Sequence, residues 1–294
     1  MRIGLRNATG LLALLLAAPV AGGELDTAMI ERATGAKGTW NDKERVFKVS
    51  LLRTDLAVRV GGVKVTSPMG LTSWAAFQDT PAGTIVMGDL VLREDQVNPV
   101  LDAALQNGLE VTALHNHFLG ESPRIMFMHI AGMGDSAKLA AGVGKALDRV
   151  REKAVEDRRN VLGEIDPART TLDPKRIEAI LGARGDLKDG VYKVVIAKPT
   201  HMHGTEMGAA MGVNTWAAFA GTDARAVVDG DFAMREPELQ GVLKALRGAG
   251  IDIVAIHSHM TGEDPRIVFL HYWSIGTTEG LAKGLRAALD TQMP

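Results

Sequence analysis

Histidine pairs recur in this sequence at a spacing that suits metal binding. An H-x-H pair is followed, after eleven further residues, by a third histidine, and the whole pattern returns 142 residues later. One more H-x-H pair lies between the two copies. Because neutral imidazole is the commonest metal ligand in proteins, we interpret all eight histidines of the chain as candidate metal ligands. They are His115, His117 and His129 in the first copy, His257, His259 and His271 in the second, and His201 and His203 between them.

The spacing within each copy predicts how the imidazoles meet. Side chains two residues apart on a β-strand share a face, so His115 and His117 point the same way if their segment is a strand. If the next segment returns as a hairpin around 120–123, His129 comes back beside them. Three neutral imidazoles on one face match a site for zinc or a copper ion. The alternatives are a metal-free pocket for an anionic or sugar-like ligand and a purely structural role.

Charged residues repeat beside the histidines. Glu121 and Glu263 follow the H-x-H pairs by four residues. Each is interpreted as a fourth ligand, as the general base of a metal-dependent, hydrolase-like enzyme, or as a solvated turn residue. Arg124 and Arg266 bind a carboxylate or phosphate in one interpretation and pair with these glutamates in the other.

Three further features bear on the site. Asp89 and Asp231 each follow a glycine, a context that is more typical of turns than of metal ligands. His201 and His203 are expected where the first copy has Leu56 and Val58, which would make the second copy the richer site. Methionines also gather near the histidines and make copper worth testing, although methionine is usually a core filler.

Composition excludes several classes of protein. The chain of 294 residues has 46% apolar and 23% charged residues and a net charge of −2, so no electrostatic footprint for nucleic acid is present. No phosphate-binding glycine loop or nucleophile motif occurs. The absence of cysteine excludes disulfides, thiolate metal sites and a lipidated cysteine. The partners we expect are therefore a metal or a small molecule.

The N-terminus has the pattern of a secretory signal peptide. Arg2 and Arg6 precede an apolar run from Leu11 to Val20 and a small-residue exit, which predicts a signal peptide over 1–23. A retained anchor is the alternative, but the run is short for a membrane span, so we expect no stable membrane insertion once it is removed. The sequence thus predicts a periplasmic or secreted protein.

The duplication extends beyond the histidines. Trp74-Ala75-Ala76-Phe77 matches Trp216-Ala217-Ala218-Phe219, and Gly88-Asp89 matches Gly230-Asp231. We therefore predict a first repeat over 24–150, a linker over 151–171 and a second repeat over 172–294.

Each repeat is predicted to contain both helices and strands. Apolar–polar alternation at 46–49 and 191–194 indicates strands, and i, i+3, i+4 spacing predicts a helix at about 94–107 that ends at Gly108. In outline each copy reads α-β-β-β-α-β-β-α, an α+β fold of two tandem pseudo-symmetric repeats with largely antiparallel sheets. The two copies can bury their faces around a pseudo-two-fold axis, which would bring hairpins 111–131 and 253–273 close together.

The motifs resemble a known family. Gly88-Asp89, Ala113-Leu114-His115-Asn116-His117 and Pro123-Arg124-Ile125, with their second copies, are similar to the LppY/LpqO-type proteins built from the domain of unknown function DUF1259. The resemblance covers 25–290 as two tandem copies and implies the fold and export from the cytoplasm. It implies no activity. The family names refer to lipoproteins, but this chain lacks the cysteine that would carry the lipid.

Overall fold

The computed structural model describes residues 25–154 and 164–292. The segment expected to be a signal peptide, 1–23, and the centre of the expected linker lie outside the described residues.

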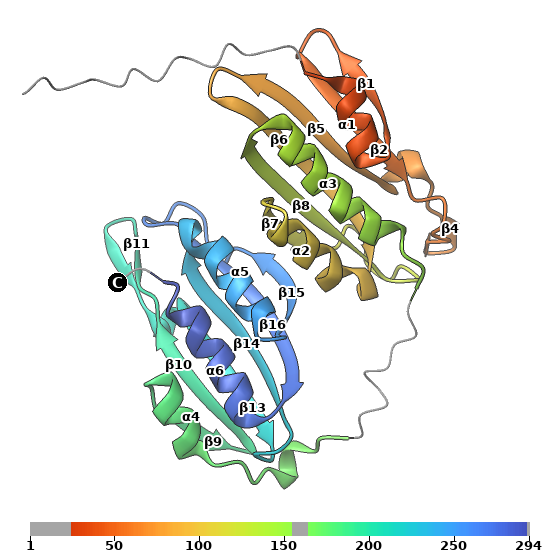
Figure 1. Ribbon diagram of the computed structural model, residues 1–294. Coiled ribbons are helices and arrows are strands. Elements are labelled where there is room, and N and C mark those ends of the chain that lie inside the picture. Colours follow the sequence, from red (N-terminus) through yellow and green to blue (C-terminus); the bar gives the residue numbers. More distant parts are fainter. Residues whose placement is uncertain (1–24, 155–163, 293–294) are drawn as a thin grey trace, which may run out of the picture.

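Both repeats contain the same series of elements (Figure 1). The first consists of α1 (Thr27–Thr34), β1 (Lys37–Asn41), β2 (Val46–Leu52), β3 (Arg59–Val60), β4 (Val63–Lys64), β5 (Thr72–Thr80), β6 (Gly83–Arg93), α2 (Val97–Gln106), β7 (Glu110–His115), β8 (Ile125–Gly134) and α3 (Ser136–Arg151). The second consists of α4 (Pro174–Leu181), β9 (Gly185–Lys188), β10 (Val191–Ala197), β11 (Thr200–Met202), β12 (Thr205–Met207), β13 (Asn214–Gly221), β14 (Ala226–Arg235), α5 (Leu239–Gly248), β15 (Asp252–His257), β16 (Ile267–Gly276) and α6 (Thr278–Leu289). The predicted α+β fold of two repeats is confirmed.

The two repeats share one antiparallel sheet of 12 strands. Its order is β1-β2-β5-β6-β8-β7-β15-β16-β14-β13-β10-β9, so the second half mirrors the first. The halves meet where β7 pairs with β15, through Leu114 and Ile256. The two hairpins lie side by side about a pseudo-two-fold axis that passes through this pair, as expected, but the repeats join along their sheet edges and not by packing sheet faces together.

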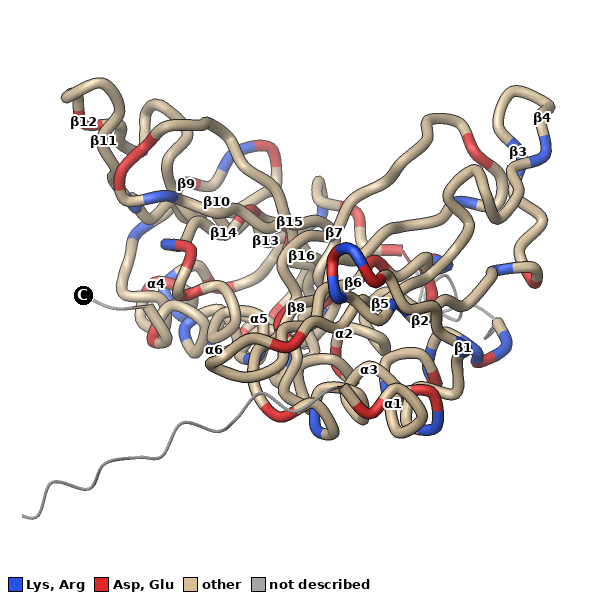
Figure 2. Tube along the Cα trace, turned by 90° about the horizontal axis from the view of Figure 1, so that it is seen from above, with Lys and Arg blue, Asp and Glu red and all other residues tan. Residues whose placement is uncertain are grey.

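The six α-helices of the described residues lie on one side of the sheet, and the small hairpins β3–β4 and β11–β12 lie on the other (Figure 2). Alternation along the strands explains this division. Leu114 and Ile256 belong to the core under the helices. The residue after each of them, His115 or His257, points to the opposite face because successive strand residues alternate. We call this second side the open face.

Local sequence signals account for the helices. Asp26, Asp135 and Asp173 cap α1, α3 and α4, since each carboxylate accepts a hydrogen bond from a backbone N–H in the first turn. Helix α2 buries the residues at its predicted i, i+3, i+4 positions and is followed by Gly108 with φ of 80°.

The outline derived from the sequence omitted the edge strands β1 and β9 and the two small hairpins. Strands β3, β4, β11 and β12 have only two or three residues each, too short for alternation to be read. Strands β1 and β9 are short and largely exposed, so they also lack an alternating apolar pattern.

Two side-chain amides form hydrogen bonds between the two repeats. Asn98 of α2 accepts from the backbone N–H of Ile253 at 2.9 Å and donates to its carbonyl at 3.3 Å. Gln240 of α5 makes the equivalent pair with Val111, at 3.1 and 2.9 Å. Each amide thus makes the two backbone hydrogen bonds that a neighbouring strand would make, beyond the point where β7 and β15 are paired.

We expect Asn98→Ala and Gln240→Ala each to lower the free energy of unfolding by about 1–2 kcal/mol, because each leaves a buried backbone N–H and C=O without a partner. Urea denaturation monitored by circular dichroism measures the change. Gln78→Ala, which removes an exposed amide bonded to the Glu44 carbonyl, is the control. Losses no larger than that of the control would mean that water replaces the amides without cost.

Candidate metal centre

The histidines of the second repeat converge on the open face around an aspartate. In the strand register, Asp231 of β14 lies opposite His271 of β16, and His257 of β15 lies opposite Phe269 of β16. His259 follows two residues after His257, and its ring stacks on Phe269 with 3.5 Å between ring centroids. Three adjacent strands therefore supply the site.

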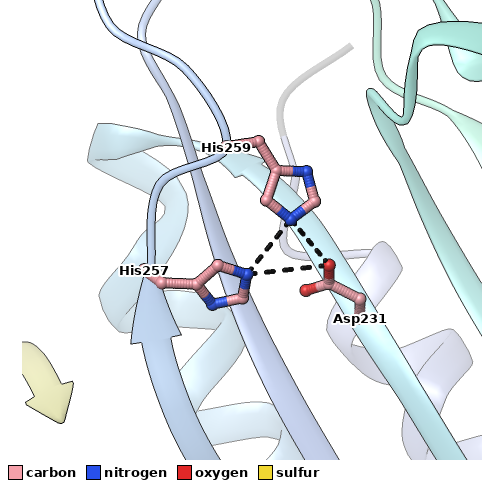
Figure 3. A group of neighbouring side chains, drawn as sticks. All are labelled: Asp231, His257 and His259. Atoms are coloured by element: carbon pink, nitrogen blue, oxygen red, sulfur yellow. Dashed lines mark hydrogen bonds and ion pairs between the residues drawn. The ribbon is translucent and has the colours of Figure 1, made fainter.

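Three possible ligand atoms, from Asp231, His257 and His259, lie within 4.8 Å of one another (Figure 3). His259 Nε2 lies 3.1 Å from Asp231 Oδ2 and 3.1 Å from His257 Nε2, and His257 Nε2 lies 3.8 Å from the same oxygen. A metal ion bound tetrahedrally at about 2.0–2.1 Å holds its ligand atoms roughly 3.3 Å apart. The observed separations bracket this value.

Backbone carbonyls orient two of the rings. His259 Nδ1 lies 3.3 Å from the Gly212 carbonyl, and His271 Nδ1 lies 3.3 Å from the Gly230 carbonyl. A carbonyl only accepts, so each Nδ1 donates in these contacts, and Nε2 is the atom that a metal would bind; in the absence of metal, His259 Nε2 faces the Asp231 carboxylate at 3.1 Å. This carbonyl-to-histidine arrangement is how proteins fix the tautomer of metal-binding imidazoles.

The charge distribution in this group favours a bound cation. Burial raises the pKa of Asp231, and the imidazoles of His271 and His259 oppose this effect. Burial, together with His271 and His259, lowers the pKa of His257 to about 4, so this ring is neutral at pH 7. Asp231 Oδ1 and His257 Nδ1 are buried without a hydrogen-bond partner. A cation placed between this carboxylate and the two Nε2 atoms would be stabilised by the carboxylate charge.

His271 lies beside this group of three. Its ring stacks on His257 at 4.6 Å between centroids, with 13° between the ring planes. The structure therefore brings the three histidines of the second repeat onto one face, as expected from the spacing, and adds Asp231. That aspartate was expected in a turn, but both Asp231 and Asp89 lie inside long strands.

Glycine explains how Asp231 fits. A Cβ atom on Gly230 would lie 2.1 Å from the Tyr272 hydroxyl, which crosses this position to donate to the Trp216 carbonyl at 2.8 Å. Glycine before the aspartate is thus required by close packing, which is why a strand residue was mistaken for a turn residue.

The first repeat has the same residues in a looser arrangement. His115 stacks with His117 and with His129, at 5.1 Å between centroids in both cases. Asp89 Oδ1 is buried without a partner, and the Asp89 charge acts on the pKa of His117 against the lowering effect of burial. Among the described residues, however, only Asp231, His257 and His259 bring three donor atoms within 4.8 Å of one another.

The expected alignment of His201 and His203 was wrong. His201 pairs through its backbone with Asp264, as Arg59 does with Ser122, so His201 corresponds to Arg59 and not to Leu56. His203 then corresponds to Gly61, and both have a positive φ, 52° and 54°.

The misalignment arose because the second repeat lacks three residues between β10 and β11. Both histidines lie on the β11–β12 hairpin and are exposed. Neither belongs to the group of three ligands.

The glutamates and arginines lie outside the group of three ligands. Glu263 is 9% exposed and accepts from the Ile267 backbone N–H at 3.2 Å, so it holds the turn rather than lying in solvent. Glu121 lines a cavity at the junction of the repeats. Arg124 pairs with Glu94 at 4.0 Å and not with Glu121, and Arg266 shares a cavity with His257 and Glu236.

The lowered pKa of His257 predicts how the stability of the metal-free protein depends on pH. The unfolded chain protonates this ring near 6.5 and the folded chain only near 4, so its contribution is complete above pH 6.5. That contribution is lost as the pH falls from 6.5 to about 4. We expect wild type to lose about 1–3 kcal/mol relative to His257→Gln across this range. Urea denaturation in EDTA at pH 7 and pH 4.5 measures the difference, and parallel behaviour of the two proteins would contradict it.

Among the described residues, no helix combines the length and apolar character that crossing a membrane requires.

Comparison with known proteins gives a family but no activity. A family model described as Domain of Unknown Function (DUF1259) matches residues 28–149 and again residues 175–291. No curated protein matches the chain.

Two solved structures show a distant likeness. One is the trimeric bacterial microcompartment shell protein PduB, 12% identical over 86% of this chain and 89% of that chain, with a TM-score of 0.20. The other is EtuB from Clostridium kluyveri, 12% identical over 86% of this chain and 89% of that chain, with a TM-score of 0.22. At these TM-scores the likeness carries no argument.

Proposed function

This chain belongs to the DUF1259 family, whose domain it contains twice, and we propose that it binds a transition-metal ion through Asp231, His257 and His259. The observation that carries the proposal is the meeting of two Nε2 atoms and one carboxylate oxygen at separations of 3.1 to 3.8 Å. His271, stacked on His257, is the fourth member of the site.

The donor set suits zinc or copper. Imidazole nitrogen and carboxylate oxygen are ligands that Zn²⁺ accepts in tetrahedral sites, and imidazole also suits copper. Met207 and Met260 pack against the cluster that contains Phe269, under the His259 ring. The first repeat has Val65 and Phe118 at these positions, so these two thioethers have no counterpart there.

We propose that the first repeat holds a weaker site at Asp89, His115, His117 and His129. Its aspartate, like Asp231, has a buried Oδ1 without a hydrogen-bond partner, but its rings must rotate before their donor atoms converge. Because this rearrangement costs free energy, the first-repeat site should bind metal with lower affinity than the second-repeat site.

Metal-dependent hydrolysis is the second candidate function. His259 is 34% exposed, which leaves solvent access for a water on the metal, and a bound metal lowers the pKa of such a water. Glu263 and Glu121 remain the proposed general bases, although Glu263 would first have to release the Ile267 N–H.

We further propose that the protein works in the periplasm or outside the cell, with a metal or small molecule as its partner and without nucleic acid. The basic and apolar pattern of residues 1–23 supports export. A metal-free module for an anionic ligand at Arg124 and Arg266 is the remaining alternative. It is weakened by the Glu94 carboxylate paired with Arg124 and by Glu236 in the cavity of Arg266.

Elemental analysis of protein purified from the periplasm, followed by calorimetric titration of the EDTA-stripped protein with Zn²⁺ and with Cu⁺, tests the proposal. We expect one tight equivalent and one weaker equivalent of the preferred metal. Protein that carries no metal above the buffer blank, and that shows no heat of binding with either ion, would refute it.

A further inference from the structure

Two cavities flank the junction of the repeats. Strands β7 and β15 pair through Leu114 and Ile256, and a cavity lies beyond each end of this pairing. The larger, about 550 Å³, is bordered by the start of β15, the loop after β7 and the start of α2. We call it the junction cavity. Its volume falls within the range of about 300–1,000 Å³ that is usual for small-molecule sites.

Large apolar side chains are left exposed in the junction cavity. Leu119 is 85% exposed, Val254 47% and Trp273 45%, and all three line this cavity. Leu119 comes from the first repeat and the other two from the second. Solvent-exposed apolar groups that gather in a hollow mark a site for a ligand or partner more often than scattered ones do.

The pseudo-symmetry of the fold supplies an internal comparison. At the positions equivalent to Leu119, Val254 and Trp273, the other half of the molecule has Thr261, Thr112 and Ala131. The same backbone therefore folds with small or polar residues at all three places. Folding does not require the indole and the two aliphatic groups in the junction cavity, so their presence on one side alone indicates a role in binding.

The charge of the junction cavity favours a cation. Glu94, Glu121 and Asp252 line it against one lining cation, Arg124. Arg124 pairs with Glu94 at 4.0 Å.

Arg247, which lies next to the cavity, does not neutralise the remaining carboxylates, those of Asp252 and Glu121. Arg247 pairs with Asp252 at 2.6 Å, but it is shared with Asp102 at 2.8 Å, so one negative charge remains in that trio. Glu121 adds a second, which leaves the cavity with two negative charges in excess.

We propose that the junction cavity binds a small organic cation with an apolar body, a primary amine or alkylammonium ion. The face of the Trp273 indole and the carboxylates of Glu121 and Asp252 attract the charged end, because an aromatic ring attracts a cation within about 6 Å of its centroid. Leu119 and Val254 cover the apolar body. Both repeats contribute, which gives the duplication a use that one copy could not provide.

The probe is the 2-phenylethylammonium ion, titrated calorimetrically into the full chain, with 3-phenylpropanoate as the anionic counterpart of similar size. EDTA is present so that the amine cannot coordinate a bound metal. We expect the amine to bind and the carboxylate not to bind. Trp273→Ala and Glu121→Gln should each weaken amine binding by about tenfold, and Trp273→Phe should keep most of it, since its ring still attracts a cation.

Glu236→Gln is the matched control, because it removes the residue equivalent to Glu94 from the smaller cavity. It should bind the amine as wild type does. The His257→Ala/His259→Ala protein should also retain amine binding, which separates this proposal from that of the metal site. Absence of amine binding at millimolar probe, tighter binding of the carboxylate, or wild-type affinity in Trp273→Ala would each overturn the proposal.

Discussion

Replacing His257 and His259 together with alanine is expected to abolish tight metal binding. The double variant removes two of the three donor atoms that meet around Asp231, including both Nε2 atoms separated by 3.1 Å. Loss of a single outer-shell partner of a metal ligand already costs about 10–100-fold in affinity, so loss of two ligands should raise the dissociation constant by at least about 100-fold. Calorimetric titration with the preferred metal, and elemental analysis of the purified variant, measure this change.

The pseudo-symmetry provides the matched comparison. His115→Ala/His117→Ala alters the same positions of the first repeat and should remove only the weaker equivalent. His203→Ala, at the tip of the β11–β12 hairpin, should keep both, because this residue lies outside the group of three ligands. Equal losses in the two double variants would show that the preformed geometry of the second repeat has no bearing on affinity.

Much of the fold could be predicted from the sequence because the same sequence pattern occurs twice in the chain. The recurrence of His115-Asn116-His117 as His257-Ser258-His259 located the hairpins, and strand alternation placed each pair of histidines on one face. The closeness of the two hairpins was also expected, but the sequence predicted packing of the sheet faces, whereas β7 and β15 pair edge to edge through Leu114 and Ile256.

The aspartate was missed because its place depends on long-range register. Asp231 meets the histidines only because β14 lies beside β16 with Asp231 opposite His271. Residue types alone favoured a turn after Gly230. The available signal was the strand-like apolar run around Gly88-Asp89 and its exact recurrence at Gly230-Asp231, which places one acidic residue per histidine cluster.

Two other features of the candidate site left no signal in the sequence. His201 was aligned by extending the offset of β10 across a three-residue deletion, and only the backbone pairing with Asp264 reveals its equivalence to Arg59. Arg124 was interpreted as an anion-binding residue or as a partner of Glu121, but it pairs with Glu94, which lies 30 positions earlier in the chain. Neither a deletion within an irregular loop nor an ion pair between distant segments leaves a periodic signal.

Asp231→Asn is expected to stabilise the metal-free protein while weakening its metal binding. Asp231 is 2% exposed, its Oδ1 has no partner, and burial raises its pKa. For an acid with a raised folded pKa, stability is present below the unfolded value of 3.8 and is lost as the pH rises through the folded value. At pH 7 the charged carboxylate therefore opposes folding, and a neutral amide of the same shape should add about 1–2 kcal/mol to the free energy of unfolding in EDTA.

The order of stabilities should invert when metal is added. A ligand at 100 times its dissociation constant stabilises the folded state by about 2.7 kcal/mol, and wild type should receive this increment whereas Asp231→Asn should not. Urea denaturation of both proteins, in EDTA and in excess metal, shows whether the curves cross. Asp229→Asn, on the same strand and face but exposed, is the control; the Asp229 charge contributes less than burial to the raised pKa of Asp231, so its stabilising effect in EDTA should be smaller and metal binding should persist. If Asp231→Asn destabilises the protein in EDTA, the carboxylate is needed to hold His259 through its 3.1 Å contact, and Asp231 is a structural partner of that ring and not a metal ligand.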